Sequence, residues 1–121
     1  MTFSYSITQS EGVSIFKLNG QIMEKAQVLD MMDQVAKLVA AGKNLFVLEL
    51  SDLKYVNSSG LNILVNILTK ARTAGGDVTV CNLSKKVSEL LVVTKLDTIF
   101  NILPSVDEAV AKLKAHKGKS S

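Results

Sequence analysis

The sequence is poor in the residues that most often build catalytic and metal sites. Its 121 residues include one cysteine, one histidine and no tryptophan. The single cysteine, Cys81, excludes a disulfide within the chain, and one thiol cannot make a zinc site, which needs several Cys or His ligands. Because Cys81 lies in the apolar run from Val78 to Leu83, we expect it to be buried and unreactive. The histidine, His116, lies in a basic C-terminal segment without a partner that could orient it for acid–base catalysis.

Loops that hold phosphates and motifs that activate a serine are also missing. No glycine-rich stretch is followed by Lys-Ser or Lys-Thr. The segment Ser58-Ser59-Gly60 superficially resembles a nucleophile elbow, but that motif has glycines two residues before and two residues after its serine. Neither serine meets both requirements. No pair of carboxylates has the spacing of an acid–base site either, so we expect a protein that is not an enzyme and needs no metal and no cofactor.

Long hydrophobic runs are absent. No segment approaches the roughly 20 apolar residues that cross a bilayer. Residues 1–6 carry neither the basic start nor the apolar stretch of a signal peptide. We therefore expect a cytoplasmic protein that does not insert into membranes.

The net charge of +3 is concentrated at one end of the chain. Lysines 112, 114, 117 and 119 lie close to the C-terminus. A nucleic-acid-binding protein usually spreads its cations over one face and adds aromatic side chains for stacking, whereas cations at the end of a helix favour the helix dipole. We expect residues 116–121 to form a basic flexible tail and expect no direct nucleic-acid binding.

What the chain has in abundance is aliphatic residues. Hydrophobic residues make up 47% of the sequence and aromatic residues only 5%, so the core must be built from Leu, Ile, Val and Ala. A chain of this length buries roughly two thirds of its unfolded surface as one domain. We expect a single domain over residues 1–115.

The apolar pattern predicts alternating strands and helices. Residues 3–18 alternate about the turn at Glu11-Gly12, which predicts a hairpin that ends at Gly20. Helical spacing predicts helices over residues 26–41 and 58–74, each followed by glycine. The apolar runs 45–50 and 78–83 predict buried strands.

The C-terminal third continues this alternation. Ser84 is a predicted N-cap for a helix through Val93, residues 99–100 predict a short strand, and Ser105 with Glu108 has capping-box spacing for a last helix. The predicted fold is therefore α/β: a mixed, mostly parallel β-sheet of four to five strands packed with about four helices.

One constellation stands out, Asn57-Ser58-Ser59-Gly60-Leu61, at the start of the second predicted helix. A helix N-terminus has free backbone N–H groups and the positive end of the dipole. Asn and Ser are both good N-caps, yet one cap is enough. Either one of these residues caps the helix and the rest are turn residues, or the extra hydroxyls have a function.

The motif and its surroundings resemble the STAS domain family, and within it the bacterial anti-sigma factor antagonists. The similarity covers nearly the whole chain and rests on Gly20, Glu49-Leu50-Ser51, Tyr55 to Leu61, Leu96-Asp97, Ile99-Phe100 and the segment from Pro104 to Val110. In the family, Asp-Ser-Ser-Gly-Leu opens the helix. Here Asn57 replaces the acidic residue, which preserves the cap but removes a negative charge that could take part in recognition by a kinase.

This resemblance implies a role in partner switching. Family members bind an anti-sigma factor that is also a serine kinase, and thereby release a sigma factor and control transcription. Phosphorylation of the first serine of the motif, here Ser58, ends this binding, and a serine phosphatase restores it. Asn57, Ser59, Gly60 and Leu61 would shape the phosphorylation site and contact the partner. We expect the protein to act as a monomer or weak dimer.

Alternatives remain at two levels. Ile63 and Ile67 flank the apolar face of the same helix, so they either contact a partner or simply widen the stripe that covers the sheet. The protein as a whole could be a STAS scaffold subunit of a sensory or lipid-transport complex that is never phosphorylated. A nucleotide-binding or nucleotide-hydrolysing enzyme is a further alternative, but the sequence contains no phosphate-binding loop.

Overall fold

The computed structural model describes the backbone of residues 3–23 and 25–119, and the side chains of these residues except 25 and 116–119. The strands are β1 (Phe3–Ser10), β2 (Val13–Ile22), β3 (Leu45–Val56), β4 (Asp77–Cys81) and β5 (Asn101–Leu103). The helices are α1 (Leu29–Ala40), α2 (Ser58–Thr73), α3 (Lys85–Val93) and α4 (Val106–Lys119), with short 3₁₀ turns at Lys25–Val28 and Leu96–Thr98.

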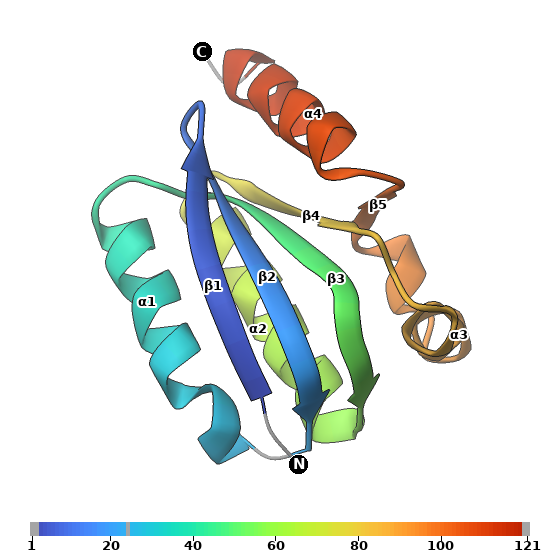
Figure 1. Cartoon of the computed structure of the whole chain (residues 1–121). Coiled ribbons are helices and arrows are strands. Elements are labelled where there is room, and N and C mark those ends of the chain that lie inside the picture. Colours follow the sequence, from blue (N-terminus) through green and yellow to red (C-terminus); the bar gives the residue numbers. More distant parts are fainter. Residues whose placement is uncertain (1–2, 24, 120–121) are drawn as a thin grey trace.

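Within the described residues the strands form one sheet in the order β1-β2-β3-β4-β5 (Figure 1). β1 pairs with β2 antiparallel, and the three other pairings are parallel. Each parallel connection contains a helix, as such crossovers require. The predicted mixed, mostly parallel sheet with four helices is confirmed.

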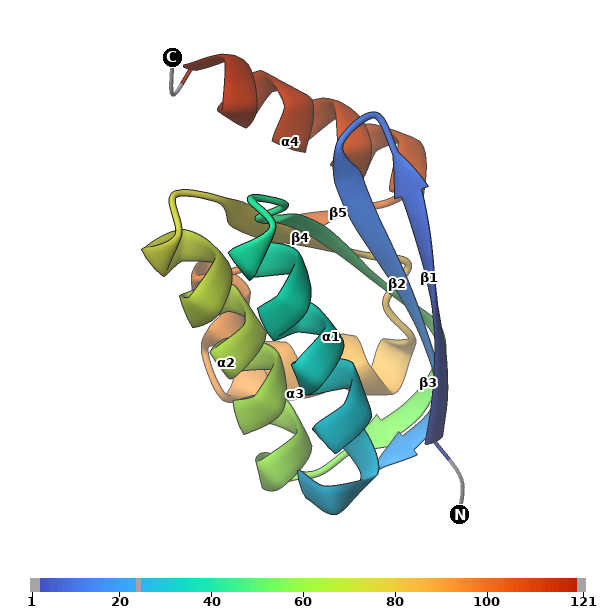
Figure 2. The ribbon, with the colours of Figure 1, turned by 90° about the vertical axis from the view of Figure 1, so that its left-hand side faces the viewer.

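The helices lie on both faces of the sheet. Figure 2 shows α1, α2 and α3 on one side and α4 across one end of the other side. Alternate residues of β3 serve the two layers: Phe46, Leu48 and Leu50 belong to the large core under α1, α2 and α3, whereas Leu45 and Val47 belong to the smaller core under α4. This explains why the first half of β3 is an almost continuous apolar run.

Two strands are longer than predicted. β2 continues past Gly20 to Ile22, and β3 continues past Leu50 to Val56. Shifts of register between β2 and β3 lie at Lys17/Asn19 and Gly20/Gln21, and such bulges change which side chains point inward. The buried residues of β3 after Leu50 are therefore Leu53 and Val56, spaced by three. A strand is recognised in a sequence by apolar residues at every second position, so this part of β3 was not predicted.

Helix and turn signals agree closely with the structure. Glu11 and Gly12 both have positive φ, 52° and 86°, as a two-residue hairpin turn demands. Ser84 caps α3 by accepting a hydrogen bond from the Val87 N–H at 3.2 Å, and Ser105 accepts one from the Glu108 N–H at 3.2 Å. Both predicted caps are confirmed.

Two details at the C-terminal end differ from the prediction. The last strand comes after residues 99–100, because Phe100 packs into the main core at the end of a 3₁₀ turn. Helix α4 extends to Lys119, past the predicted start of the tail at residue 116, while residues 120–121 and the side chain of His116 lie outside the described part. Before that segment, the Lys114 ammonium forms an exposed ion pair with the Glu11 carboxylate at 2.6 Å.

Cys81 is buried on the α4 face of the sheet. Burial, assisted by the nearby Glu49 carboxylate, raises the pKa of its thiol to about 12. Since the thiolate is the nucleophile, this cysteine is inert at neutral pH, in line with the expectation of a structural residue.

Two buried hydroxyl groups differ in their partners, which yields a stability prediction. Ser14 accepts a hydrogen bond from Gln9 Nε2 at 2.9 Å, whereas the Thr79 hydroxyl has no hydrogen-bond partner. An unpaired buried polar group destabilises the fold by about 1–3 kcal/mol. We expect Thr79→Val to raise the free energy of unfolding by about 1 kcal/mol in urea titration. Ser14→Ala is the matched control and should lower it; a Thr79→Val protein less stable than the wild type would contradict this account.

Candidate functional site

The motif from Asn57 to Leu61 lies where two parallel strands end side by side. Ile22 at the end of β2 pairs with Val56 at the end of β3, and the Asn57 N–H donates to the Ile22 carbonyl at 3.2 Å. Helix α2 begins at the next residue, Ser58. The carboxyl ends of strands in α/β sheets, with helix N-termini beside them, are the usual place for binding sites.

Asn57 is the N-cap of α2 and also joins two loops. Its Oδ1 accepts a hydrogen bond from the Gly60 N–H at 3.0 Å, and its Nδ2 donates to the Met23 carbonyl at 2.7 Å. The two bonds agree on the orientation of the amide, because each needs the atom type found there. One side chain therefore holds the start of α2 against the loop that follows β2.

Gly60 allows α2 to approach the end of β2 closely. A Cβ at this position would lie 2.9 Å from the Ile22 carbonyl oxygen and 3.0 Å from Ile22 Cγ2. The first contact, to a backbone oxygen, is closer than a Cβ tolerates, and the second is tight. The glycine of the motif therefore positions the helix N-terminus.

Ser58 and Ser59 are both exposed and occupy the first two positions of α2. Because Asn57 supplies the cap, neither hydroxyl is needed to satisfy the helix, and no hydrogen bond of either hydroxyl to another described group is present. The two serines are thus accessible at the positive end of a 16-residue helix.

The last three predicted site residues, Leu61, Ile63 and Ile67, have exposed fractions of 6%, 3% and 0%. All three belong to the main core. The burial of Ile63 and Ile67 contradicts the alternative that they form a docking patch. Because α2 packs against both the sheet and α1, the buried stripe of the helix is wide.

Comparisons with known proteins agree with this geometry. The family model of the STAS domain matches residues 4–109. The chain belongs to the STAS domain family. A candidate anti-sigma factor antagonist of Thermotoga maritima is 33% identical over 73 residues, which are 60% of this chain and 65% of that protein. BtrV of Bordetella bronchiseptica, described in the same way, is 27% identical over 104 residues, 86% of this chain and 89% of BtrV.

Solved structures of anti-sigma factor antagonists have a similar fold over most of this chain. The crystal structure of a candidate Thermotoga maritima antagonist has a TM-score of 0.82 at 25% identity, covering 91% of this chain and 94% of that one. The phosphorylated form of the Bacillus antagonist SpoIIAA has a TM-score of 0.71 at 13% identity, covering 90% and 98%. At that identity the second likeness concerns the fold alone.

The structure gives a reason for the departure of this STAS domain from the Asp-Ser-Ser-Gly-Leu pattern. Aspartate could accept the bond from the Gly60 N–H, but it has no N–H to donate to the Met23 carbonyl. Its second carboxylate oxygen would face that carbonyl oxygen instead. Asn57 therefore suits the local contacts of this chain.

A stability prediction follows from this contact. Asn57→Asp should lower the free energy of unfolding by about 1 kcal/mol, because the lost hydrogen bond and the facing oxygens outweigh the gain of about 0.3–1 kcal/mol from a negative charge at the helix N-terminus. Chemical denaturation measures the change. Asn57→Ser, which keeps a cap without a facing charge, is the control; an Asn57→Asp protein as stable as the wild type would contradict the role assigned to the Met23 contact.

Two features of the site were missed by sequence reasoning. The Met23 carbonyl lies 34 positions before Asn57, and no local pattern indicates that the two meet. Lys86 of α3 lies over the ring of Tyr55, with its ammonium 5.8 Å from the ring centroid, which brings the start of α3 beside the end of β3. Both result from tertiary packing.

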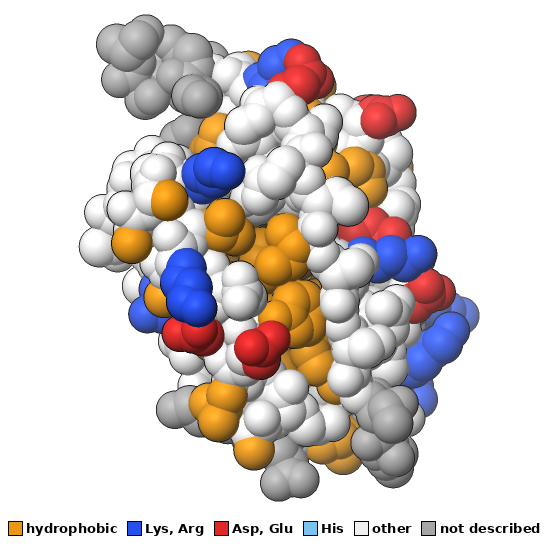
Figure 3. Space-filling view, turned by 60° about the vertical axis from the view of Figure 1, so that its left-hand side comes forward, with side chains coloured by type: hydrophobic (Ala, Val, Ile, Leu, Met, Phe, Trp, Pro, Cys, Tyr) orange, Lys and Arg blue, Asp and Glu red, His pale blue; other side chains and the backbone are white. Residues whose placement is uncertain are grey.

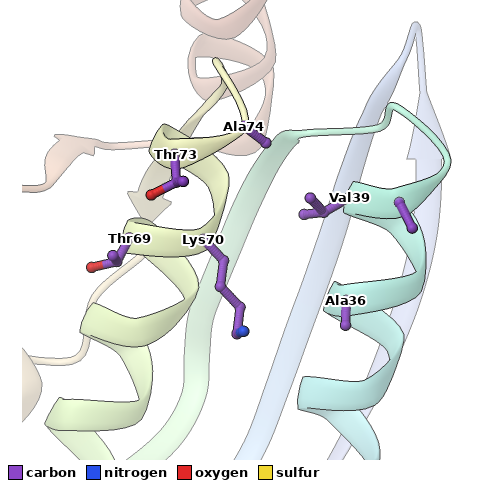
Figure 4. A pocket seen from close by; sticks show the side chains of 7 residues that line it. Ala36, Val39, Thr69, Lys70, Thr73 and Ala74 are labelled. Atoms are coloured by element: carbon purple, nitrogen blue, oxygen red, sulfur yellow. The ribbon is translucent and has the colours of Figure 1, made fainter.

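A groove between α1 and α2, away from Ser58, has no His, Cys, Asp or Glu among its lining residues. It holds about 370 Å³ between α1 and α2 and is lined by Ala36, Val39, Ala40, Thr69, Lys70, Thr73 and Ala74 (Figure 4). Among the described residues no group of three or more His, Cys, Asp and Glu side chains is placed to hold a metal ion. None of the helices in the described part is both long and apolar enough to span a membrane.

Proposed function

We propose that this STAS protein is an anti-sigma factor antagonist of a cytoplasmic partner-switching pathway. It binds an anti-sigma factor that is also a serine kinase, and phosphorylation of Ser58 ends the binding. The observation that supports this most is that Asn57 caps α2, which leaves the Ser58 hydroxyl exposed and without a structural role. The relatives described as antagonists support the same class of function.

The position of Ser58 suits a modification that must leave the fold intact. A phosphate there would lie at a helix N-terminus, which favours negative charge. Its neighbours Asn57 and Gly60 are held by contacts with the end of β2. The backbone around the phosphorylated residue would therefore be rigid, and the change is confined to surface charge. SpoIIAA, with the same fold, has been solved in both unphosphorylated and phosphorylated forms.

Ser59, together with Asn57, whose side-chain amide donates to the Met23 carbonyl, would position Ser58 for the kinase. A serine phosphatase would remove the phosphate again. ATP belongs to the kinase, so this chain needs no cofactor of its own.

Reconstitution with the kinase tests the proposal. The purified protein is incubated with ATP and the anti-sigma serine kinase of the same organism, and phosphate incorporation is followed for wild type, Ser58→Ala and Ser59→Ala. We expect phosphorylation of the wild type and of Ser59→Ala, and none of Ser58→Ala. Equal phosphorylation of both alanine variants would contradict Ser58 as the acceptor, and an unmodified wild type would contradict the switch.

A further inference from the structure

Strand β1 has the features of an unprotected sheet edge. It is the edge strand at one end of the sheet, and its outer edge pairs with no strand of the described chain. Its eight residues, FSYSITQS, include no charged residue and no proline. Its register with β2 runs through eight consecutive pairs without a bulge.

Such an edge is unusual for a protein that is not meant to pair there. Free edges offer a row of unpaired N–H and C=O groups, and natural proteins protect them with lysine, proline, bulges or short strands. β1 uses none of these devices. The opposite edge, β5, is only three residues long, so the contrast within one sheet points to β1 as the edge available for pairing.

An apolar seam runs beside this edge. Phe3, Tyr5 and Ile7 alternate on the inner face of β1 and are only partly buried against the main core. Phe3 stacks on Tyr5 and Tyr5 on Phe16, each at 6.2 Å between ring centroids. Figure 3, which turns the α1 side of the molecule forward, shows a continuous hollowed band of apolar side chains on this face.

Helix α1 forms the floor of this seam and projects beyond the edge. In Figure 1 α1 lies to the outside of β1, and in Figure 2 it lies in the layer below the sheet. The Tyr5 hydroxyl donates a hydrogen bond to the Asp30 carboxylate on α1. Gln34 and Leu38 follow Asp30 at helical spacing on the same side, so the helix would lie under a strand added next to β1.

We propose that the free edge of β1 binds an extended segment of a partner protein, which adds a sixth strand to the sheet over α1. Main-chain hydrogen bonds to β1 supply the affinity, and side-chain preference follows from the surroundings. Alternate residues of the segment are apolar and enter the seam. The segment carries a basic residue where it passes the exposed Asp30 carboxylate. This surface is separate from the Ser58 site and does not depend on the function proposed above.

A second copy of the chain fits this edge less well than a single extended segment. Antiparallel pairing of two β1 strands about a two-fold axis would place both α1 helices on the same face of the joined sheet. Each α1 already projects past its own edge (Figure 1), so the two helices would meet in the same space. A segment without its own helix avoids this clash.

Titration of the ¹⁵N-labelled full chain with a defined peptide tests the proposal. The probe has the β1 sequence with a lysine at each end, which supplies alternating apolar residues and a positive charge. At millimolar peptide, we expect chemical-shift changes along residues 3–10 and α1. We also expect at least tenfold slower hydrogen exchange at those alternate β1 amides that point away from β2.

Two N-methylated peptides are the matched controls. A strand uses the N–H groups of alternate residues on one edge, so methylation of one alternate set should weaken binding at least tenfold, and methylation of the other set should not. Ser58→Glu protein should bind the probe like the wild type. No shift change at β1, equal effects of both methylation patterns, or sedimentation as a dimer joined through β1 would each overturn the proposal.

Discussion

Phosphate on Ser58 is expected to weaken binding to the proposed serine-kinase partner at least about 100-fold while the fold stays intact. A phosphoserine carries nearly two negative charges. At the N-terminus of α2 this charge gains about 0.3–1 kcal/mol, so the domain is not destabilised. Inside a protein interface an unpaired charge costs several kcal/mol of desolvation, and each 1.4 kcal/mol is tenfold in affinity. The interface penalty therefore dominates.

Calorimetric titration of the kinase with the unmodified and the phosphorylated protein measures this loss, and thermal unfolding of both forms checks the fold. Ser58→Glu should lose affinity in the same direction, while Ser58→Ala, which removes the hydroxyl without adding charge, should bind within a few-fold of the wild type. A phosphorylated protein that binds as tightly as the unmodified one would contradict the switch. Loss of affinity together with a lower melting temperature would contradict the claim that only the surface changes.

Gly76→Ala is expected to be strongly destabilising, and more so than the same substitution at Gly42, Gly60 or Gly75. Gly76 is buried in the connection between α2 and β4. A Cβ there would lie 1.9 Å from the Asn44 carbonyl oxygen and 2.6 Å from its carbon. Both atoms are backbone, so the start of β3 or the start of β4 must move. We expect a loss of about 3 kcal/mol or more in the free energy of unfolding, in the range of severe overpacking.

Gly42→Ala is the matched control for this effect. Gly42 has a φ of +83° but open space around the added Cβ, so its substitution should cost only about 1 kcal/mol of backbone strain. Urea denaturation of both variants compares the cost of backbone strain, at position 42, with the cost of a steric clash, at position 76. Equal losses for the two proteins would show that the Asn44 backbone yields easily and would contradict the packing described for the α2–β4 connection.

The sequence predicts the elements of this fold better than their lengths. The helices over residues 58–74 and 84–93 begin at recognisable caps, because capping depends on residues three positions apart. The second half of β3 was missed for a different reason. Its buried residues, Leu50, Leu53 and Val56, are spaced by three where register shifts disturb the β2–β3 pairing. Such bulges depend on the partner strand and leave no local signal.

The candidate site likewise has features that local sequence predicts and features that depend on tertiary contacts. The position of Ser58 at a helix start follows from the local pattern of polar and apolar residues. The second task of Asn57, its bond to the Met23 carbonyl, depends on a contact across 34 residues. Burial of Ile63 and Ile67 depends on how α1 packs beside α2, and the sequence left this open. Helical periodicity identifies an apolar stripe but not how many neighbours cover it.

Phosphopeptide mass spectrometry of the protein recovered from its native cells, in growth and under stress, tests the central claim most directly. Cleavage after lysine yields the peptide from Tyr55 to Lys70, which contains both serines of the motif, and fragmentation distinguishes Ser58 from Ser59. The account predicts phosphate on Ser58 with an occupancy that changes between conditions. A fully recovered peptide that is unmodified in every condition, or is modified only on Ser59, would contradict it and would favour a permanently bound STAS subunit.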